Sequence, residues 1–336
     1  MSLINTIVVM ILILTHVIYA NNFSSISDLG ASAQAISLGN IQGASRSADA
    51  IFSNPAGLYK VRNYSVSLFQ ATVMNEINYL NMSLCKRTKY GNIGVGYYSA
   101  SVGDIPFTAI DPDTAEFIVQ DMYSYKNQVA KIAYQTKISR RFHLGINYTK
   151  YKISFHDITA SGYGFDIGIL KIFRYFTLST FLQNVNQGSI NYQSSSDSDY
   201  TATEKIPLSI SSSLRISIAD FILYPQIKLY DNNFLPSFGI NYNPRFIPFL
   251  KFNAGYRQLL DYAYQKHDKA SFGLDLKLSS IVFHYAYERS DYTLADHTSY
   301  FSFTYNFKLN NSKSTSLIGS SSSALLLLPF LYVLTL

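Results

Sequence analysis

Few residues of this 336-residue chain have types and spacings that could do chemistry. A hydrolase needs a nucleophile, a base and an orienting group held close together. The alternation of side chains around His143 and His284 places each histidine on the same face as nearby serines, which leaves an acyl hydrolase as one interpretation. Because no nucleophile motif accompanies them, we interpret both as ordinary polar residues lining an interior, and we predict no catalytic residues.

The remaining histidines and the single cysteine do not form a recognisable metal or redox site. The histidines lie far apart in the sequence and lack the spacing of metal ligands. One cysteine cannot form an intrachain disulfide or a cysteine-based zinc site. We therefore predict no metal and no cofactor. The residues concerned are His16, His156, His267, His297 and Cys85.

The composition favours strands over helices. Hydrophobic residues make up 48% of the chain, which suits alternating strands better than a bundle of membrane helices. The chain has 28 Tyr and 23 Phe but no Trp, so an aromatic belt at the membrane interfaces would be built from Tyr, with Phe inside it. The net charge is +6 with Lys and Arg scattered, and we expect no nucleic-acid partner.

Alternation of large apolar with small or polar residues runs through residues 63–308. In the last run, Phe301, Phe303 and Tyr305 point one way, while Ser302 and Thr304 point the other. Another sheet would have to cover such an apolar face in a soluble sandwich, whereas in a closed barrel it faces lipid. Counting the periodic runs gives about 14 strands, an even number as bacterial barrels require. We therefore predict an all-β fold, a transmembrane antiparallel barrel of about 14 strands.

The two ends of the chain differ from this periodic region. Residues 1–20 resemble a signal peptide, although no Lys or Arg precedes the apolar core; an uncleaved membrane anchor is the alternative. Residues 309–336 form a Ser-rich spacer and an apolar tail that is short for a membrane-spanning helix. The order of spacer and tail also imitates a lipid-anchor signal, but we favour an extension lying at the membrane surface.

Residues 21–62 carry a family resemblance. Small residues dominate residues 30–53, and the turn Asn54-Pro55-Ala56-Gly57-Leu58 follows them. This order resembles the amino-terminal signature of the PorV/PorQ family, a branch of the FadL-like outer-membrane barrels. Shorter similarities follow at residues 130–151, 162–168, 181–185, 252–257 and 270–289.

The same turn has a physical rationale of its own. Pro55 fixes its own φ and moves Asn54 out of the helical region, and we expect Gly57 to adopt a conformation closed to other residues. Small residues before the turn would allow a compact segment to pack inside a barrel. We therefore predict that residues 21–62 form a plug within the barrel and that residues 54–58 are its gate; a static cap is the alternative.

The resemblance implies passive transport of a hydrophobic or amphiphilic small molecule, such as a fatty-acid-like ligand, across the bacterial outer membrane. It also implies an alternative, a PorV-like docking barrel for secretion-system proteins. We predict external loops at residues 103–124, 185–204 and 291–296, and a periplasmic turn at Ser139-Arg140. The first two of these loops would be the docking surfaces. The lipid bilayer is the partner that both interpretations share.

Overall fold

The computed structural model describes residues 29–73, 76–111, 116–196, 201–260, 265–289 and 298–307. The predicted signal peptide (1–20), the tail (309–336) and the predicted loop 291–296 lie outside the described residues.

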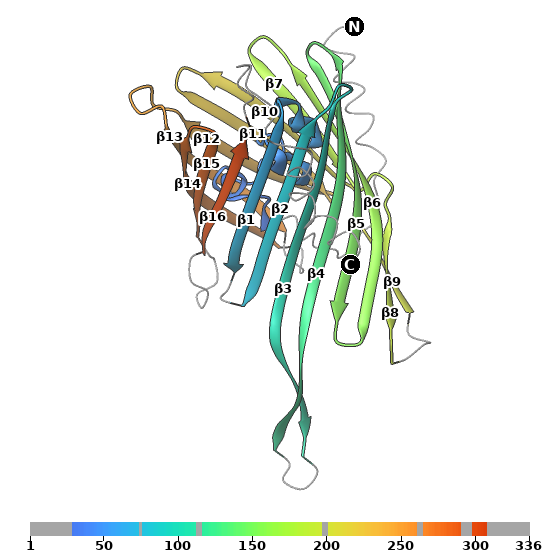
Figure 1. The fold of residues 1–336 in the computed structure, drawn as a ribbon. Coiled ribbons are helices and arrows are strands. Elements are labelled where there is room, and N and C mark those ends of the chain that lie inside the picture. The colour runs from blue at the N-terminus through green and yellow to red at the C-terminus, as the bar shows by residue number, and fades with distance from the viewer. Residues whose placement is uncertain are drawn as a thin grey trace, which may run out of the picture.

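The described strands form a closed antiparallel barrel (Figure 1). Each ring strand pairs with the next, and an additional pairing of β5 with β6 closes a ring of 14 strands, as predicted from the alternation. The ring consists of β1 (Tyr64–Val73), β2 (Ile77–Arg87), β3 (Asn92–Ile110), β4 (Phe117–Ser139), β5 (Phe142–Phe155), β6 (Ile158–Ile172), β7 (Phe176–Gln183), β10 (Ser209–Ile218), β11 (Phe221–Tyr230), β12 (Asn233–Tyr242), β13 (Leu250–Leu260), β14 (Lys266–Leu278), β15 (Ile281–Glu288) and β16 (Thr298–Asn306).

The prediction of a loop at residues 185–204 is wrong, because this stretch contains β8 (Ser189–Ser194) and most of β9 (Thr201–Lys205). β8 pairs with residues 158–162 at the start of β6, and β9 pairs with β8, so this hairpin extends the wall beyond the end of β7. Alternation explains it: Ile190 is fully buried and Tyr192 partly buried, whereas Asn191 is exposed.

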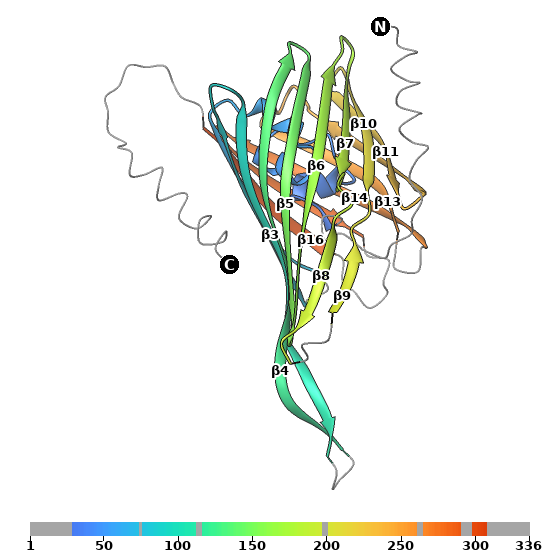
Figure 2. The ribbon, with the colours of Figure 1, turned by 90° about the vertical axis from the view of Figure 1, so that its right-hand side faces the viewer.

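The predicted loop at residues 103–124 is likewise mostly strand. β3 continues to Ile110, β4 begins at Phe117, and the two project as a ribbon beyond the barrel (Figure 1, Figure 2). The polar and acidic residues of this stretch suggested a loop, but cross-strand pairs such as Ile105 with Tyr123 sustain the ladder. Register shifts after Val102 accommodate the bend of the ribbon.

The two faces of the wall follow the predicted alternation. On β5, Asn147 and Thr149 are buried inside the barrel, whereas Ile146 and Tyr148 are 47% and 41% exposed on the outside. The turn at residues 140–141 is tight, as predicted, since Ser139 pairs with Phe142. The outer face is therefore apolar and the inner face largely polar, which is the pattern of a barrel in lipid.

Residues 29–61, here called the lumenal segment, lie inside the ring (Figure 1). The segment contains the short helix α2 (Ala33–Ser37) and two turns of 3-10 helix, η2 (Ala48–Phe52) and η3 (Pro55–Lys60). α2 packs on β13 to β16, and η3 packs on β3 to β6, so the segment contacts opposite walls. Among the described residues, no helix has the length and hydrophobicity to cross a membrane.

Candidate functional site

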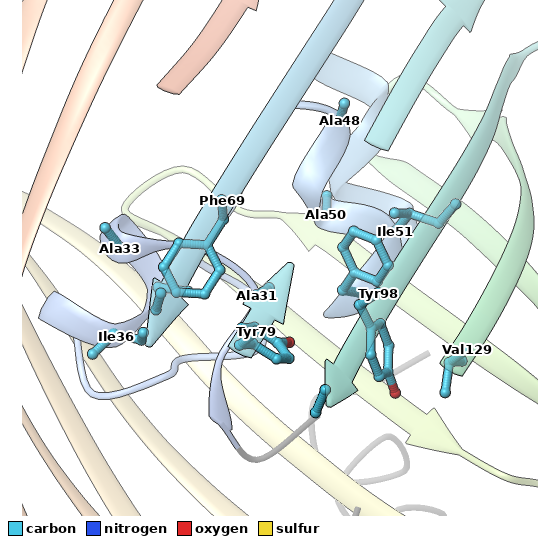
Figure 3. Close-up of a cluster of buried hydrophobic side chains, with 14 of the residues drawn as sticks. Ala31, Ala33, Ile36, Ala48, Ala50, Ile51, Phe69, Tyr79, Tyr98 and Val129 are labelled. Atoms are coloured by element: carbon cyan, nitrogen blue, oxygen red, sulfur yellow. The ribbon is translucent and has the colours of Figure 1, made fainter. Parts of the chain in front are cut away.

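The lumenal segment packs against the wall through small and branched apolar side chains. Phe52 meets Tyr98 of β3 edge-on, with ring centroids 5.5 Å apart. Phe69 of β1 and Tyr79 of β2 complete the wall side of the same cluster (Figure 3). Small residues allow the backbone of the segment to approach the wall closely. Burial of the apolar surface between them stabilises this packing. The members from the segment are Ala31, Ala33, Ala35, Ile36, Ala48, Ala50, Ile51, Phe52, Leu58 and Val61.

Inward-facing asparagines satisfy backbone carbonyls of this segment. Carbonyl oxygens outside regular helices need other donors when they are buried. Three wall amides supply them from β2, β3 and β5. Asn81 donates to the Ala31 carbonyl at 2.9 Å, Asn92 to the Val61 carbonyl at 3.2 Å, and Asn147 to the Ile51 carbonyl at 2.8 Å.

The predicted gate turn lies against β5, β6 and β7. The side-chain amide of Asn54 donates to Ser179 Oγ at 2.7 Å and to the carbonyl oxygens of Ile169 and Thr180, both at 3.1 Å. Pro55, Ala56, Gly57 and Leu58 are all buried. The turn is therefore fastened to β6 and β7 through Asn54, while Asn92 of β3 holds its other end by donating to the Leu58 carbonyl.

Two wall glycines leave room for this turn. A Cβ on Gly145 would overlap the backbone of Pro55 and Ala56, and a Cβ on Gly168 would overlap the side chain of Asn54. Both glycines belong to the inward face of their strands. Because glycine has no side chain, the wall is hollowed at these two positions, and the turn occupies the space. We call this space at Gly145 and Gly168 the cradle of the turn.

The predicted conformation of Gly57 is wrong. Its φ lies outside the left-handed region, which among the described glycines only Gly30 and Gly39 adopt. Gly57 continues η3, and a Cβ there would lie 2.6 Å from the carbonyl oxygen of Ser45. Close packing therefore explains the glycine. The expectation for Asn54 is confirmed, since its φ of −94° and ψ of 108° are extended.

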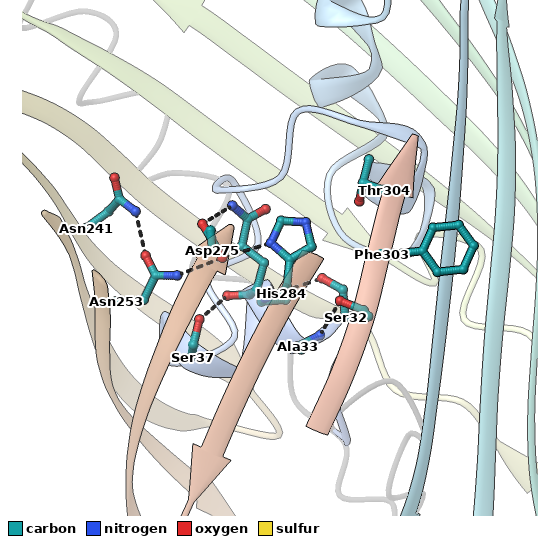
Figure 4. Close-up of polar contacts among 12 residues, drawn as sticks. Ser32, Ala33, Ser37, Asn241, Asn253, Asp275, His284, Phe303 and Thr304 are labelled. Atoms are coloured by element: carbon teal, nitrogen blue, oxygen red, sulfur yellow. Dashed lines mark hydrogen bonds and ion pairs between the residues drawn. The ribbon is translucent and has the colours of Figure 1, made fainter. Parts of the chain in front are cut away.

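The opposite wall holds α2 through a carboxylate. Asp275 of β14 is buried and accepts hydrogen bonds from Gln34 at 3.0 Å and Asn253 at 3.1 Å, while His284 Nδ1 lies 2.8 Å away (Figure 4). Ser302 Oγ accepts from the backbone N–H of Ala33 at 3.1 Å. His284 therefore belongs to the attachment of the lumenal segment.

The other histidines are distributed as follows. His143 stacks on Tyr59 of the lumenal segment, with ring centroids 4.2 Å apart. His156 stacks on Phe107 at the base of the projecting ribbon, and His267 pairs with Leu259 across β13 and β14. His16 and His297 are outside the described residues. Within the described part of the chain, no three residues of the kinds His, Cys, Asp and Glu are grouped so as to hold a metal.

The wall is interrupted between β6 and its neighbours β7 and β8. The β6–β7 ladder covers Ile167–Ile172, and the β6–β8 ladder covers Ile158–Gly162, leaving residues 163–166 of β6 between them. Asn184 has a φ of 58°, which turns the chain away from β7. We call residues 163–166 and 184–188 together the wall break.

Two side-chain contacts and one backbone hydrogen bond close the wall break. Asn186 Oδ1 accepts from the Phe165 N–H at 2.9 Å, and the Val185 N–H donates to the Phe165 carbonyl at 2.8 Å. Asp166 Oδ1 accepts from the Asn184 N–H at 3.0 Å. The same carboxylate pairs with Lys131 at 2.7 Å, and both side chains have no exposed surface. Sequence reasoning missed this pair, because its partners lie on different strands.

An apolar cavity of about 340 Å³ opens at the end of the barrel that carries the long hairpins. It lies on the lumen-facing side of β4, β5, β6 and β8 and borders the buried apolar cluster. A cavity of this size lies within the range of roughly 300 to 1,000 Å³ for small-molecule sites. Its lining consists of Tyr125, Ile153, Phe155, Ile158 and Tyr192.

A polar clasp joins two hairpins beside this cavity. In the turn between β5 and β6, the Asp157 carboxylate accepts hydrogen bonds from the hydroxyls of Ser196 and Ser194, the latter at 2.7 Å. Hydrogen bonds from Ser196 and then Ser194 lower the pKa of Asp157, since they stabilise its charged form.

No family model and no curated protein matches the sequence. Among solved structures, the toluene transporter TodX of Pseudomonas putida is similar, with 13% identity and a TM-score of 0.57 over 82% of this chain and 98% of that one. The chain shares its fold. The CymD monoaromatic hydrocarbon channel gives 13% identity and a TM-score of 0.56 over 84% and 99% of the two chains. The Ralstonia pickettii toluene transporter TbuX gives 10% identity and 0.54 over 82% and 98%.

These neighbours are FadL-like barrels, so the predicted resemblance is confirmed at the level of fold. The finer resemblance to the PorV/PorQ family stays a prediction.

Proposed function

We propose that this chain is a passive channel for hydrophobic small molecules in the bacterial outer membrane. The observation that carries the proposal is the apolar cavity on the lumen-facing side of a closed barrel whose lumen is occupied by its own residues 29–61. Neighbours of the same fold are described as toluene transporters and monoaromatic hydrocarbon channels, which supports the proposal.

The route begins at the cavity and follows the buried apolar cluster inward. Beyond the cavity, the buried apolar cluster continues with Tyr151, Ala160 and Ile190. Contact with these side chains removes the apolar surface of a hydrophobic ligand from water, which is favourable. The lumenal segment then blocks the path. The ligand passes when residues 54–58 leave their cradle, or it leaves sideways through the wall break, where side chains replace part of the ladder.

The role of Asn54, Pro55, Ala56, Gly57 and Leu58 as the gate is part of this proposal. Its support is that Asn54 carries three hydrogen bonds from the turn to the wall. Loss of these contacts frees the Asn54 end of the turn, which then moves about its Leu58 end, where Asn92 of β3 still donates to the Leu58 carbonyl.

The secretion-docking alternative is not favoured, because the neighbours of the same fold are described as channels. The turn at residues 54–58 still resembles the PorV/PorQ signature, and we propose common ancestry with that family on this motif alone.

Uptake of radiolabelled toluene at low concentration by lipopolysaccharide-bearing cells that express the full chain tests the channel. A variant that fills the cavity, Ile153→Trp, should reduce uptake to the level of cells without the protein. Heat-dependent mobility of the barrel on gels checks that the variant folds. Uptake that is the same with and without the protein would refute the channel.

A further inference from the structure

We propose that Glu204 is a charge filter at the mouth of the channel: it admits uncharged, compact apolar molecules and disfavours carboxylates, including fatty acids. The inference rests on the proposed function, since it concerns what enters the cavity described above. It narrows the expected ligand from hydrophobic or amphiphilic molecules to uncharged ones.

Glu204 lies beside the cavity, because it is hydrogen-bonded to one of the lining residues. The hydroxyl of Tyr192 donates to Glu204 Oε2 at 2.9 Å. Across the β8–β9 pair, Ile190 lies opposite Glu204 and Tyr192 lies opposite Ala202, so Glu204 shares the lumen-facing side with Tyr192. Glu204 is half-buried, so its charge is only partly screened by water.

A carboxylate ligand in this cavity would meet a like charge. It would also lose hydration against Ile153 and Ile158, which offer no hydrogen bond in return. Both effects act against an anion and leave an uncharged molecule unaffected.

The fully buried cations of the described residues are already paired. Lys131 pairs with Asp166 at 2.7 Å, and Arg257 pairs with Glu288 at 2.8 Å. A carboxylate moving inward would have to displace a carboxylate of the protein to reach either cation.

The size and lining of the cavity favour a compact ligand. Three of its five lining residues, Tyr125, Phe155 and Tyr192, are aromatic, and such side chains pack well on flat rings. A volume of about 340 Å³ suits a single substituted ring better than an extended long acyl chain.

The test compares two probes of similar size, toluene and benzoate, for binding to the purified full chain in lipid nanodiscs at neutral pH. We expect the wild-type chain to bind benzoate at least about tenfold more weakly than toluene. Glu204→Gln should raise the ratio of benzoate to toluene affinity by about tenfold, because it removes the charge and keeps the shape.

Glu116→Gln is the matched control, since it makes the same chemical change on the projecting ribbon and should leave both affinities unchanged. If the wild-type chain binds both probes alike, or if Glu204→Gln leaves the ratio within about twofold, the filter is refuted while the channel stands. If neither probe binds, the proposed channel fails and the filter fails with it.

Discussion

The side-chain amide of Asn54 lies 2.7 Å from the hydroxyl oxygen of Ser179 and joins the lumenal segment to the barrel wall. The same amide also donates to two wall carbonyls, while its carbonyl oxygen accepts from the Ala56 N–H at 2.9 Å. One residue therefore caps the helical turn and fastens it, which makes it the most direct place to test gating.

Asn54→Ala should loosen the turn. Loss of the cap and of the wall contacts should cost about 1 to 3 kcal/mol and raise the ion conductance of the barrel in planar bilayers. Gln42→Ala is the control, because the Gln42 amide donates within the segment, to the Asn40 carbonyl at 3.4 Å. Equal conductance for both variants would contradict a gate at residues 54–58.

Gly57→Val should displace the same turn for a steric reason. A Cβ there would lie 2.6 Å from the Ser45 carbonyl oxygen, and overpacking of this kind costs about 1 to 3 kcal/mol. Thermal unfolding followed by gel mobility measures the loss. Gly103→Val is the matched control, since a Cβ at Gly103 meets nothing within 4 Å. Unchanged stability and uptake in Gly57→Val would remove the turn from the mechanism.

Asp166→Asn should destabilise the wall break. The change leaves Lys131 buried without its counter-charge, which costs about 3 to 5 kcal/mol, and it weakens the bond to the Asn184 N–H. Denaturant unfolding in detergent gives the change in free energy.

For comparison, Asp220→Asn breaks a pair whose Arg245 side chain is 80% exposed and should cost less than about 1 kcal/mol. If the two variants lose the same stability, the buried pair does not hold the break closed.

Acid should release the clasp between Asp157 and the serines of the β8 end. The pKa of Asp157 is lowered in the folded chain, so the clasp is fully present above the ordinary aspartate value of about 3.9 and is lost as the pH falls through the lower folded value. The protection factor of the Ser195 N–H against hydrogen exchange should fall in that acidic range, since this N–H donates to the Asp157 carbonyl at 2.9 Å. Asp157→Asn should abolish the pH dependence; a persisting dependence would assign it to another group.

Alternation along the chain predicted the architecture well. Phe301, Phe303 and Tyr305 on one side of β16, with Ser302 and Thr304 on the other, identify the lipid face and the inner face without any knowledge of neighbours. The period of two is a local property of an extended backbone, so sequence alone reveals it. The number of ring strands follows from counting such runs.

The extent of the strands was harder to predict. The polar and acidic character of residues 103–124 suggested a loop, yet even Pro106 pairs with Met122 within the ribbon. A strand pair without neighbours on either side tolerates residues that a central strand would not. Whether a polar stretch forms a strand depends on the strand with which it pairs. Local composition does not specify that partner.

By itself, the sequence determined which side chains face lipid, about how many strands cross the membrane, and that Asn54 is extended before Pro55. Only the tertiary structure decided that Gly168 makes room for Asn54, that Lys131 pairs with Asp166, and that Tyr192 brings Glu204 to the cavity. The first set depends on backbone geometry over a few residues. The second depends on the register between strands, which is set by the closure of the whole barrel.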